Sequence, residues 1–316
     1  MSEVDRLAVL RALRYQLAGP MGQLKDRCQE KLKQLSSPIP SVLYHYTDTR
    51  GFMGIISKHA LWATRTDFLN DSSEIPYARD LFKNRIAHFR QKSSNLEEAK
   101  LLDWIESNCD FVREYFKAYA ISLSSRDDDL SQWRGYSGGL GGYSIGFDFT
   151  AIPLATSIFE ARKELEPRIV EVIYRPDKQI ECLDDLIEQI FLVFRNLINK
   201  TTADTIGNLR RFISQDVINL VADYFIRFKN PAVLDEREWR LVVLGGSGEL
   251  VHYRDSRFGL TPYLKYSGDS GGLPITNIVQ GPRSEPELSK EALSGFLAKH
   301  GHERVRVFLS KVPLRF

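Results

Sequence analysis

Two glutamates, Glu236 and Glu238, have a spacing that could support chemistry on a sugar. They lie in segment 235–240, D-E-R-E-W-R, at the mouth of a predicted strand. Residues i and i+2 of a strand share one face. One carboxylate of such a pair can stabilise a developing oxocarbenium ion, and the other can accept a proton from the incoming nucleophile. The alternative is a solvated strand edge on which the glutamates pair with Arg237 and Arg240.

A histidine, His45, lies inside the apolar and aromatic segment 42–46, which predicts a short buried strand. Its functional interpretation is a hydrogen-bond donor to the ribose of a ligand. The alternative is a core histidine whose hydrogen bonds are satisfied within the protein. Tyr44 and Tyr46 would face the side opposite His45 because side chains alternate along a strand.

Asn70 and Asp71 form a polar cluster with Glu74 in the loop that follows a second predicted strand. Amide and carboxylate groups suit the recognition of an amide or a ribose. Both residue types also form turns through side-chain hydrogen bonds to the backbone, and this alternative stays open.

Aromatic residues surround a glycine cluster in segment 132–146. Their rings could stack on a planar group such as nicotinamide or adenine, and glycines allow a ligand to approach the backbone closely. The alternative is a hairpin loop with core aromatics. No phosphate-binding G-x-x-x-x-G-K-[ST] loop is present. The three aromatic residues of interest are Trp133, Tyr136 and Tyr143.

Composition excludes several classes of protein. A net charge of +2 argues against binding to nucleic acid by bulk electrostatics. The three cysteines form no C-x-x-C pair, so neither a zinc site nor a disulfide framework is expected, and a reducing compartment fits best. No run of about 18 apolar residues predicts a membrane span. The charged N-terminal segment does not resemble a signal peptide. We therefore expect a cytoplasmic protein without a metal site.

The chain divides near residue 40 at the linker 36–41, S-S-P-I-P-S. Residues 1–40 are predicted to be an N-terminal helical extension, and residues 41–316 the main domain. Gly19-Pro20 predicts a break that makes the extension a helical hairpin. The hairpin either packs on the main domain or serves as a docking arm, residues 1–36, for a partner or a second copy of the chain.

Short strands and helices follow without a regular alternation, which favours an α+β fold with a mixed or antiparallel sheet flanked by helices. Alternating and short apolar segments predict the strands, and longer amphipathic segments predict the helices. Strands are expected at 42–46, 60–64, 119–124, 143–149, 168–174, 238–244, 249–253, 260–266, 275–279 and 305–309. Helices are expected at 51–59, 75–92, 96–117, 130–135, 178–198, 203–228 and 287–299.

Several short motifs occur in an order that resembles the bacterial family called domain of unknown function 2971. The motifs are Y-H-Y-T, F-L-N-D-S-S-E, I-S-L-S-S, Q-W-R-G-Y, E-R-E-W-R and V-Q-G-P, within about residues 42–283. A looser resemblance is to the ADP-ribosyltransferase superfamily, which has a histidine on a first strand, a central aromatic residue and a glutamate on a late strand. This resemblance implies a split sheet with NAD, a substrate, bound in its cleft.

The resemblance to the ADP-ribosyltransferases also implies roles for individual residues. His45 would hold the adenosine-side ribose, and Tyr136 or Tyr143 would stack on nicotinamide. Glu238 would bond the nicotinamide ribose, Glu236 would assist the acceptor, and Ser124 would support Glu238. The whole implied NAD-binding set is His45, Tyr46, Thr47, Asn70, Asp71, Ser124, Trp133, Tyr136 and Tyr143.

Two features depart from that superfamily. Its E-x-E members usually have arginine where His45 stands, and segment 122–125, S-L-S-S, only approximates Ser-Thr-Ser. These departures leave the acceptor open between a protein and a nucleic acid. The expected function is an NAD-dependent ADP-ribosyltransferase, a toxin-like effector in bacterial phage defence. The alternatives are an NAD glycohydrolase, a nucleotide-binding sensor without catalysis, and an interaction protein.

Overall fold

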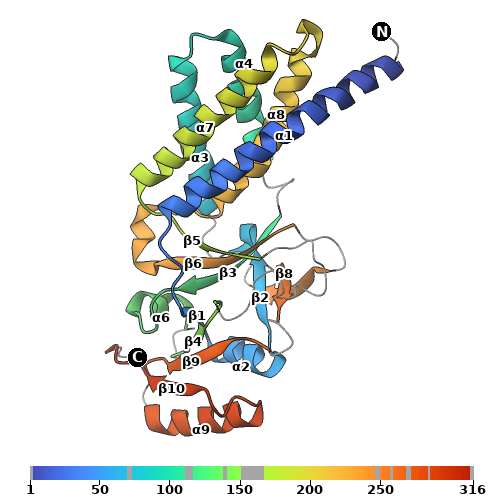
Figure 1. Ribbon diagram of the computed structural model, residues 1–316. Coiled ribbons are helices and arrows are strands. Elements are labelled where there is room, and N and C mark those ends of the chain that lie inside the picture. The colour runs from blue at the N-terminus through green and yellow to red at the C-terminus, as the bar shows by residue number, and fades with distance from the viewer. Residues whose placement is uncertain are drawn as a thin grey trace. The chain divides into compact units, whose positions relative to one another are not determined.

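The computed structural model describes residues 3–69, 73–110, 117–137, 141–150, 167–245, 250–256, 259–267, 272–283 and 285–313. The chain divides into two compact units (Figure 1). Unit 1 consists of Met1–Ser37, Asp71–Phe116 and Ile173–Ala232. Unit 2 consists of Pro38–Asn70, Lys117–Val172 and Val233–Phe316.

Unit 1 is built from helices whose apolar sides form one core. Fully buried leucine, isoleucine, valine and phenylalanine side chains come from all three segments of this unit, so the segments fold together. Its elements are α1 (Glu3–Leu35), α3 (Glu74–Lys92), α4 (Leu96–Cys109), α7 (Pro176–Ile198), η2 (Ala203–Thr205) and α8 (Ile206–Phe225).

Helix α1 is continuous through Pro20, so the predicted break at Gly19-Pro20 is wrong. A proline inside a helix removes one backbone hydrogen bond and crowds the carbonyl four residues earlier, at Gln16. Here a buried stripe with intervals of three or four residues runs past the proline and keeps both halves on one core. The stripe consists of Leu13, Leu17, Met21, Leu24, Cys28 and Leu32.

Replacing this proline should stabilise unit 1. Pro20→Ala restores an N–H that can donate to Gln16 and removes the ring, so the free energy of unfolding should rise by up to about 3 kcal/mol. Urea unfolding followed by circular dichroism measures the change. Pro38→Ala, outside the helix, is the matched control and should not raise stability. An unchanged midpoint for Pro20→Ala would contradict the continuous helix.

Unit 2 is built on a mixed sheet that has ten strands in the described part of the chain. Strands β9 and β10 are parallel, and the other pairs of named strands are antiparallel. Its strands are β1 (Leu43–Thr47), β2 (Leu61–Arg65), β3 (Ala118–Ser124), β4 (Tyr143–Phe147), β5 (Arg168–Glu171), β6 (Glu238–Leu244), β7 (His252–Ser256), β8 (Gly259–Tyr266), β9 (Ile275–Gln280) and β10 (Arg306–Leu309).

Short helices connect these strands. Asp48 caps α2 by accepting a hydrogen bond from the Gly51 amide at 2.7 Å. The helical elements are α2 (Thr49–Lys58), η1 (Thr66–Phe68), α6 (Leu130–Tyr136), η3 (Pro231–Glu236) and α9 (Pro286–Lys299). The predicted helix 96–117 is confirmed as far as Cys109, and residues 111–116 lie outside the described part.

The sheet divides at one edge of β3. Strand β6 pairs with β3 along its whole length, which leaves the other edge to two strands. Strand β1 pairs there at Ser124, and β2 pairs there at Tyr119 and Ala120. Ser122 therefore lies between the two contacts, and we call this stretch of the β3 edge the split.

The two faces of the sheet differ in chemistry. The core face carries apolar side chains such as Leu43, Ile145 and Leu241, which pack with α2 and α9. Side chains alternate along each strand, so the residues between these point to the other side. Besides apolar residues such as Ala120 and Val242, the register places eight polar residues of β1–β4 and β6 on this second face, called the polar face: Tyr44, Tyr46, Thr64, Ser122, Ser124, Ser144, Glu238 and Arg240.

The structure confirms an α+β fold with a mixed sheet and helices. In chain order the strands and helices follow the predicted ones closely. The division into residues 1–40 and 41–316 stays a prediction, as does the similarity to an ADP-ribosyltransferase fold. Among the described helices, none has both the length and the apolar character needed to cross a membrane.

Candidate functional site

Glu238 begins β6 and is buried, with 4% of its surface exposed. Arg240, also on the polar face and 1% exposed, binds it through two hydrogen bonds. The Nε–Oε1 and Nη2–Oε2 distances are both 2.9 Å. Ser124 lies directly opposite Glu238 on β3. Ser124 and Glu238 are therefore neighbours on adjacent strands, whose backbones lie about 5 Å apart.

Glu236 does not share a strand face with Glu238, so that part of the prediction is wrong. Glu236 ends η3, and Arg237 between the two glutamates has a φ of 44°, in the left-handed region. This conformation breaks the alternation on which the shared face depended. The backbone carbonyl of Glu236 instead accepts hydrogen bonds from Ser124 Oγ and Gln132 Nε2, each at 3.2 Å.

His45 occupies the split. Its Nδ1 lies 2.9 Å from the carbonyl oxygen of Ser122, on the edge of β3 between the contacts of β1 and β2. A carbonyl only accepts hydrogen bonds, so Nδ1 carries the proton and Nε2 of the neutral ring is an acceptor. Burial lowers the pKa of His45, and the positive charge of Arg254 adds to this effect. His45 thus donates a hydrogen bond to a carbonyl on the β3 edge that no strand pairs with, and its Nε2 carries no proton.

The lowered pKa of His45 predicts a loss of stability in acid. The unfolded chain takes up a proton on this ring as the pH falls below about 6.5, before the folded chain does. The contribution of neutral His45 to the free energy of unfolding is complete above that pH, and it is lost as the pH falls towards the pKa of His45 in the folded chain. His45→Asn keeps an N–H donor for Ser122 but does not titrate. Its free energy of unfolding should fall less between pH 7.5 and pH 5 than that of the wild type, whereas equal slopes would contradict the assignment.

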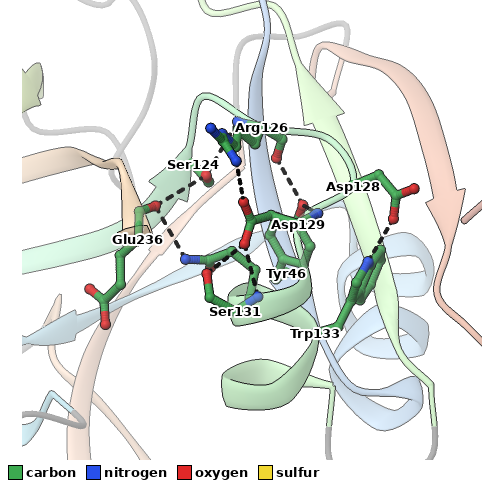
Figure 2. A network of polar contacts seen from close by, with 9 residues as sticks. Tyr46, Ser124, Arg126, Asp128, Asp129, Ser131, Trp133 and Glu236 are labelled. Atoms are coloured by element: carbon green, nitrogen blue, oxygen red, sulfur yellow. Dashed lines mark hydrogen bonds and ion pairs between the residues drawn. The ribbon is translucent and has the colours of Figure 1, made fainter. Parts of the chain in front are cut away.

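A hydrogen-bonded network fixes the loop between β3 and α6 beside these residues (Figure 2). Tyr46 Oη donates to the Arg126 carbonyl at 2.9 Å and accepts from the Asp129 amide at 3.0 Å. Burial acts to raise the pKa of Asp129, but hydrogen bonds from Ser131 and Arg126 outweigh it and lower that pKa. Asp129 thus remains an anion that caps α6. Ser124 Oγ accepts from the Arg126 amide at 3.2 Å, which joins β3 to this network.

Trp133 and Tyr136 pack on the polar face of the sheet, but they differ in how far solvent can reach them. Trp133 is fully buried, donates from Nε1 to Asp128 at 2.7 Å and meets Tyr46 edge-on, with ring centroids 4.7 Å apart. A tryptophan in these contacts is a core residue. Tyr136 is partly buried and packs against the same small cluster. Of the two predicted ring-stacking residues on this side, Tyr136 is the accessible one.

Tyr143 and Thr47 lie on the opposite side of the sheet from Glu238. Tyr143 is directly opposite Thr47 in the register and belongs to the core face, where its ring stacks on Phe52 with centroids 4.1 Å apart. The glycine before it serves the packing of strands, because a Cβ at Gly142 would lie 2.1 Å from the Thr47 carbonyl oxygen. The structure therefore does not bring Tyr143 together with Glu238.

Asn70 and Asp71, predicted to contact NAD, lie outside the described residues. Ser137 and Ser144 lie in segments with G-x-S-x-G spacing, which marks a nucleophile when it joins a strand to a helix. Ser137 instead follows α6, and Ser144 is inside β4, so neither has that geometry. The described residues contain no group of three or more His, Cys, Asp or Glu side chains arranged to hold a metal ion.

Arg254 is a further charged residue near the split that no sequence motif marks. It lies on β7, and its Nη2 donates to Thr64 Oγ1 of β2 at 3.0 Å. Its guanidinium carbon lies 5.9 Å from the centre of the Trp62 ring. The sequence gives no signal for this placement, because β7 reaches β2 only through β8.

Comparison with known proteins adds one finding. No curated protein and no solved structure matches the chain. Residues 132–241 run from Gln132 in α6 to Leu241 in β6 and include Glu236, Glu238 and Arg240. This segment matches the model of a family described as protein of unknown function (DUF2971), and the match supports the resemblance to that family.

Proposed function

We propose that unit 2 binds NAD and transfers its ADP-ribose group, with Glu238 as the carboxylate that promotes loss of nicotinamide. One juxtaposition carries the proposal. Ser124 is paired with Tyr44 of β1 on one side and with Glu238 of β6 on the other. His45, the neighbour of Tyr44, occupies the split. The first-strand histidine, the strand-end serine and the late-strand glutamate thus lie on neighbouring strands, with Ser124 and Glu238 on the polar face and His45 in the split on the side of Leu43 and Ile145.

The pairing of Glu238 with Arg240 is compatible with this role. An ionised carboxylate has about four acceptor positions, and the guanidinium fork uses two of them, so this ion pair does not by itself exclude a bond from a ribose hydroxyl. When the bond from ribose to nicotinamide breaks, positive charge develops on the sugar, and a fixed carboxylate beside it lowers the energy of the transition state. The ion pair restricts the carboxylate to one orientation, which favours such a role.

Two observations favour alternatives within the same site. Glu236 lies outside β6, so it does not share the strand face expected of a residue that assists the acceptor. This favours water as the acceptor, which would make the protein an NAD glycohydrolase. Glu238 is only 4% exposed, so little of its carboxylate is open to a substrate. This favours a sensor in which Glu238 has a structural role and the nucleotide is bound without turnover.

Incubation with NAD labelled in its adenylate part separates these functions. A transferase should attach label to a component of a bacterial lysate, and a glycohydrolase should release free labelled ADP-ribose. A sensor should gain thermal stability from NAD and leave it intact. Protein and nucleic-acid fractions of the lysate identify the acceptor class. If NAD neither stabilises the protein nor is consumed, the proposal fails.

The resemblance extends the proposal to a toxin-like effector in phage defence. Expression of the wild type in a bacterial host should then slow growth, and expression of Glu238→Gln should not. Glu285→Gln, which changes an exposed glutamate of unit 2, is the matched control and should slow growth like the wild type. Equal growth of all three strains would count against toxicity.

A further inference from the structure

We propose that the polar face of unit 2 carries a binding surface for single-stranded nucleic acid at the end of the sheet formed by β2, β8 and β7. This surface, called the β2–β8 surface, consists of Trp62, Tyr263, Lys58, Lys265 and Arg254. Binding of a strand there does not depend on the proposed function. Only the assignment of that strand as the acceptor of ADP-ribose rests on the proposed function.

The centre of the β2–β8 surface is a pair of stacked aromatic rings. Trp62 of β2 and Tyr263 of β8 have ring centroids 4.6 Å apart and planes 29° apart. Tyr263 is opposite Thr64 in the register, and Trp62, two residues before Thr64, shares the polar face with both. Tyr263 is buried, whereas Trp62 is half-buried and keeps part of its side chain open to solvent. An unpaired base can stack on such a ring, because every base has a π-face.

Basic side chains surround the Trp62 ring. Lys58, in the last turn of α2, places its Nζ 5.5 Å from the centre of this ring. Lys265 of β8 is directly opposite Trp62 in the register. Lys58 is exposed and Lys265 is half-buried, so a ligand can approach both lysines from solvent. Arg254, whose guanidinium carbon lies 5.9 Å from the ring centre, donates to Thr64 and adds its positive charge behind them.

No acid compensates these charges within the part of the chain that the structure describes. In that part, no carboxylate lies within ion-pair distance of Lys58, Lys265 or Arg254. The acid of strands β2, β7 and β8 is Asp255, which is opposite Leu260 and therefore points to the other face. The net charge of the chain is only +2, but a local excess of cations on one face favours an anionic partner.

Single-stranded nucleic acid fits both parts of the β2–β8 surface. Its phosphates complement the lysines, and its unpaired bases can stack on Trp62. The bases of a duplex are already paired and stacked, so a duplex would use only the charges. An acidic protein segment would also meet the charges but offer no planar ring to the tryptophan.

The β2–β8 surface also has a suitable place for an acceptor. Strand β2 pairs with β3 at Tyr119 and Ala120, on one side of the split. Ser124 of β3 and Glu238 of β6 lie on the same polar face as Trp62. A strand bound at Trp62 would therefore lie on the face that carries the proposed catalytic carboxylate.

Fluorescence anisotropy without NAD tests the inference, with labelled single strands of DNA and RNA of about 12 nucleotides and a DNA duplex of the same sequence. Wild type should bind the single strands more tightly than the duplex, and binding should weaken as salt rises. The tighter of the two single strands identifies the sugar of the partner. Lys58→Gln/Lys265→Gln should weaken single-strand binding about 10-fold and reduce the slope of log affinity against log salt by about 1.4, or about 0.7 per lost phosphate contact.

Lys299→Gln/Arg304→Gln is the matched control, because it removes the same charge from two exposed positions of unit 2. Lys299, like Lys58, lies in the last turn of a helix. This control should bind like the wild type. Trp62→Ala should weaken single-strand binding about 10- to 100-fold. Trp62→Phe keeps a ring against Tyr263 and should retain most of the affinity, and unfolding curves identify any variant that is not folded.

Three results would each overturn the inference: equal binding of duplex and single strand, binding of polyglutamate as tight as that of a single strand, or unchanged binding in the lysine double variant. Single-strand binding without consumption of NAD would keep this inference and reject the transferase. Consumption of NAD without single-strand binding would reject this inference and keep the proposed function.

Discussion

Replacing Arg240 by methionine should lower the free energy of unfolding of unit 2 by about 3–5 kcal/mol. The change leaves the Glu238 carboxylate buried, with both bonds from its guanidinium partner removed. Removing the cation of a buried ion pair is strongly unfavourable for the carboxylate that remains. Removing both charges in the double variant Glu238→Leu/Arg240→Met should restore most of the loss, because apolar side chains can fill the same volume. Urea unfolding followed by circular dichroism gives both values.

The exposed pair Arg175–Asp177 provides a matched control. It also joins an arginine to an acid two residues away through two hydrogen bonds, but its side chains are 66% and 62% exposed. Arg175→Met should change the stability little, because water solvates the remaining aspartate. If Arg240→Met behaves like Arg175→Met, or if the double variant is no more stable than Arg240→Met, then burial does not govern the Glu238–Arg240 pair.

Trp133→Ala should also lower the stability of unit 2 by about 3–5 kcal/mol. The ring is fully buried against Tyr46, and Gly281 approaches it so closely that a Cβ there would lie 2.9 Å from the ring. Trp133→Phe should retain most of this packing and lose only the bond to Asp128. Asp128 would still accept hydrogen bonds from Ser310 at 2.5 Å and from the Lys311 amide at 2.7 Å. The loss for phenylalanine should therefore be about 1–2 kcal/mol.

Trp104, which is 40% exposed, is the control for the size of the side chain. Trp104→Ala should be tolerated much better than Trp133→Ala. This comparison also decides between two roles for Trp133, because the resemblance to the ADP-ribosyltransferases implies that Trp133 binds NAD. A Trp133→Ala protein as stable as the wild type, but unable to bind NAD, would support the binding role over the core role.

The sequence predicted the strands and helices of this protein well, because local signals determine them. The alternating segment 143–149 and the segment 238–244 predicted β4 and β6. Helix α1 was predicted wrongly at Pro20. The local signal of a proline was outweighed by packing against α7 and α8, whose residues lie more than 150 positions away.

The candidate site was predictable only in part. The order of His45, Ser124 and Glu238 suggested a common site, and the register brings their strands together. The faces were not predictable, because they depend on pairing between strands far apart in the chain. Tyr143 thus lies on the core face, and the φ of Arg237 separates Glu236 from Glu238. The placement of Arg254 also depends on the path from β7 through β8 to β2.

Release of nicotinamide from NAD tests the central claim most directly. Wild type, Glu238→Gln and Glu236→Gln are incubated with NAD, and nicotinamide is quantified by chromatography. Glutamine at position 238 keeps an oxygen for Arg240, and unfolding curves identify any variant that is not folded. We predict that the wild type releases nicotinamide, that Glu238→Gln slows the release by about 100- to 1,000-fold, and that Glu236→Gln has a smaller effect on it. Absence of release by the wild type, or equal release by wild type and Glu238→Gln, would contradict the account.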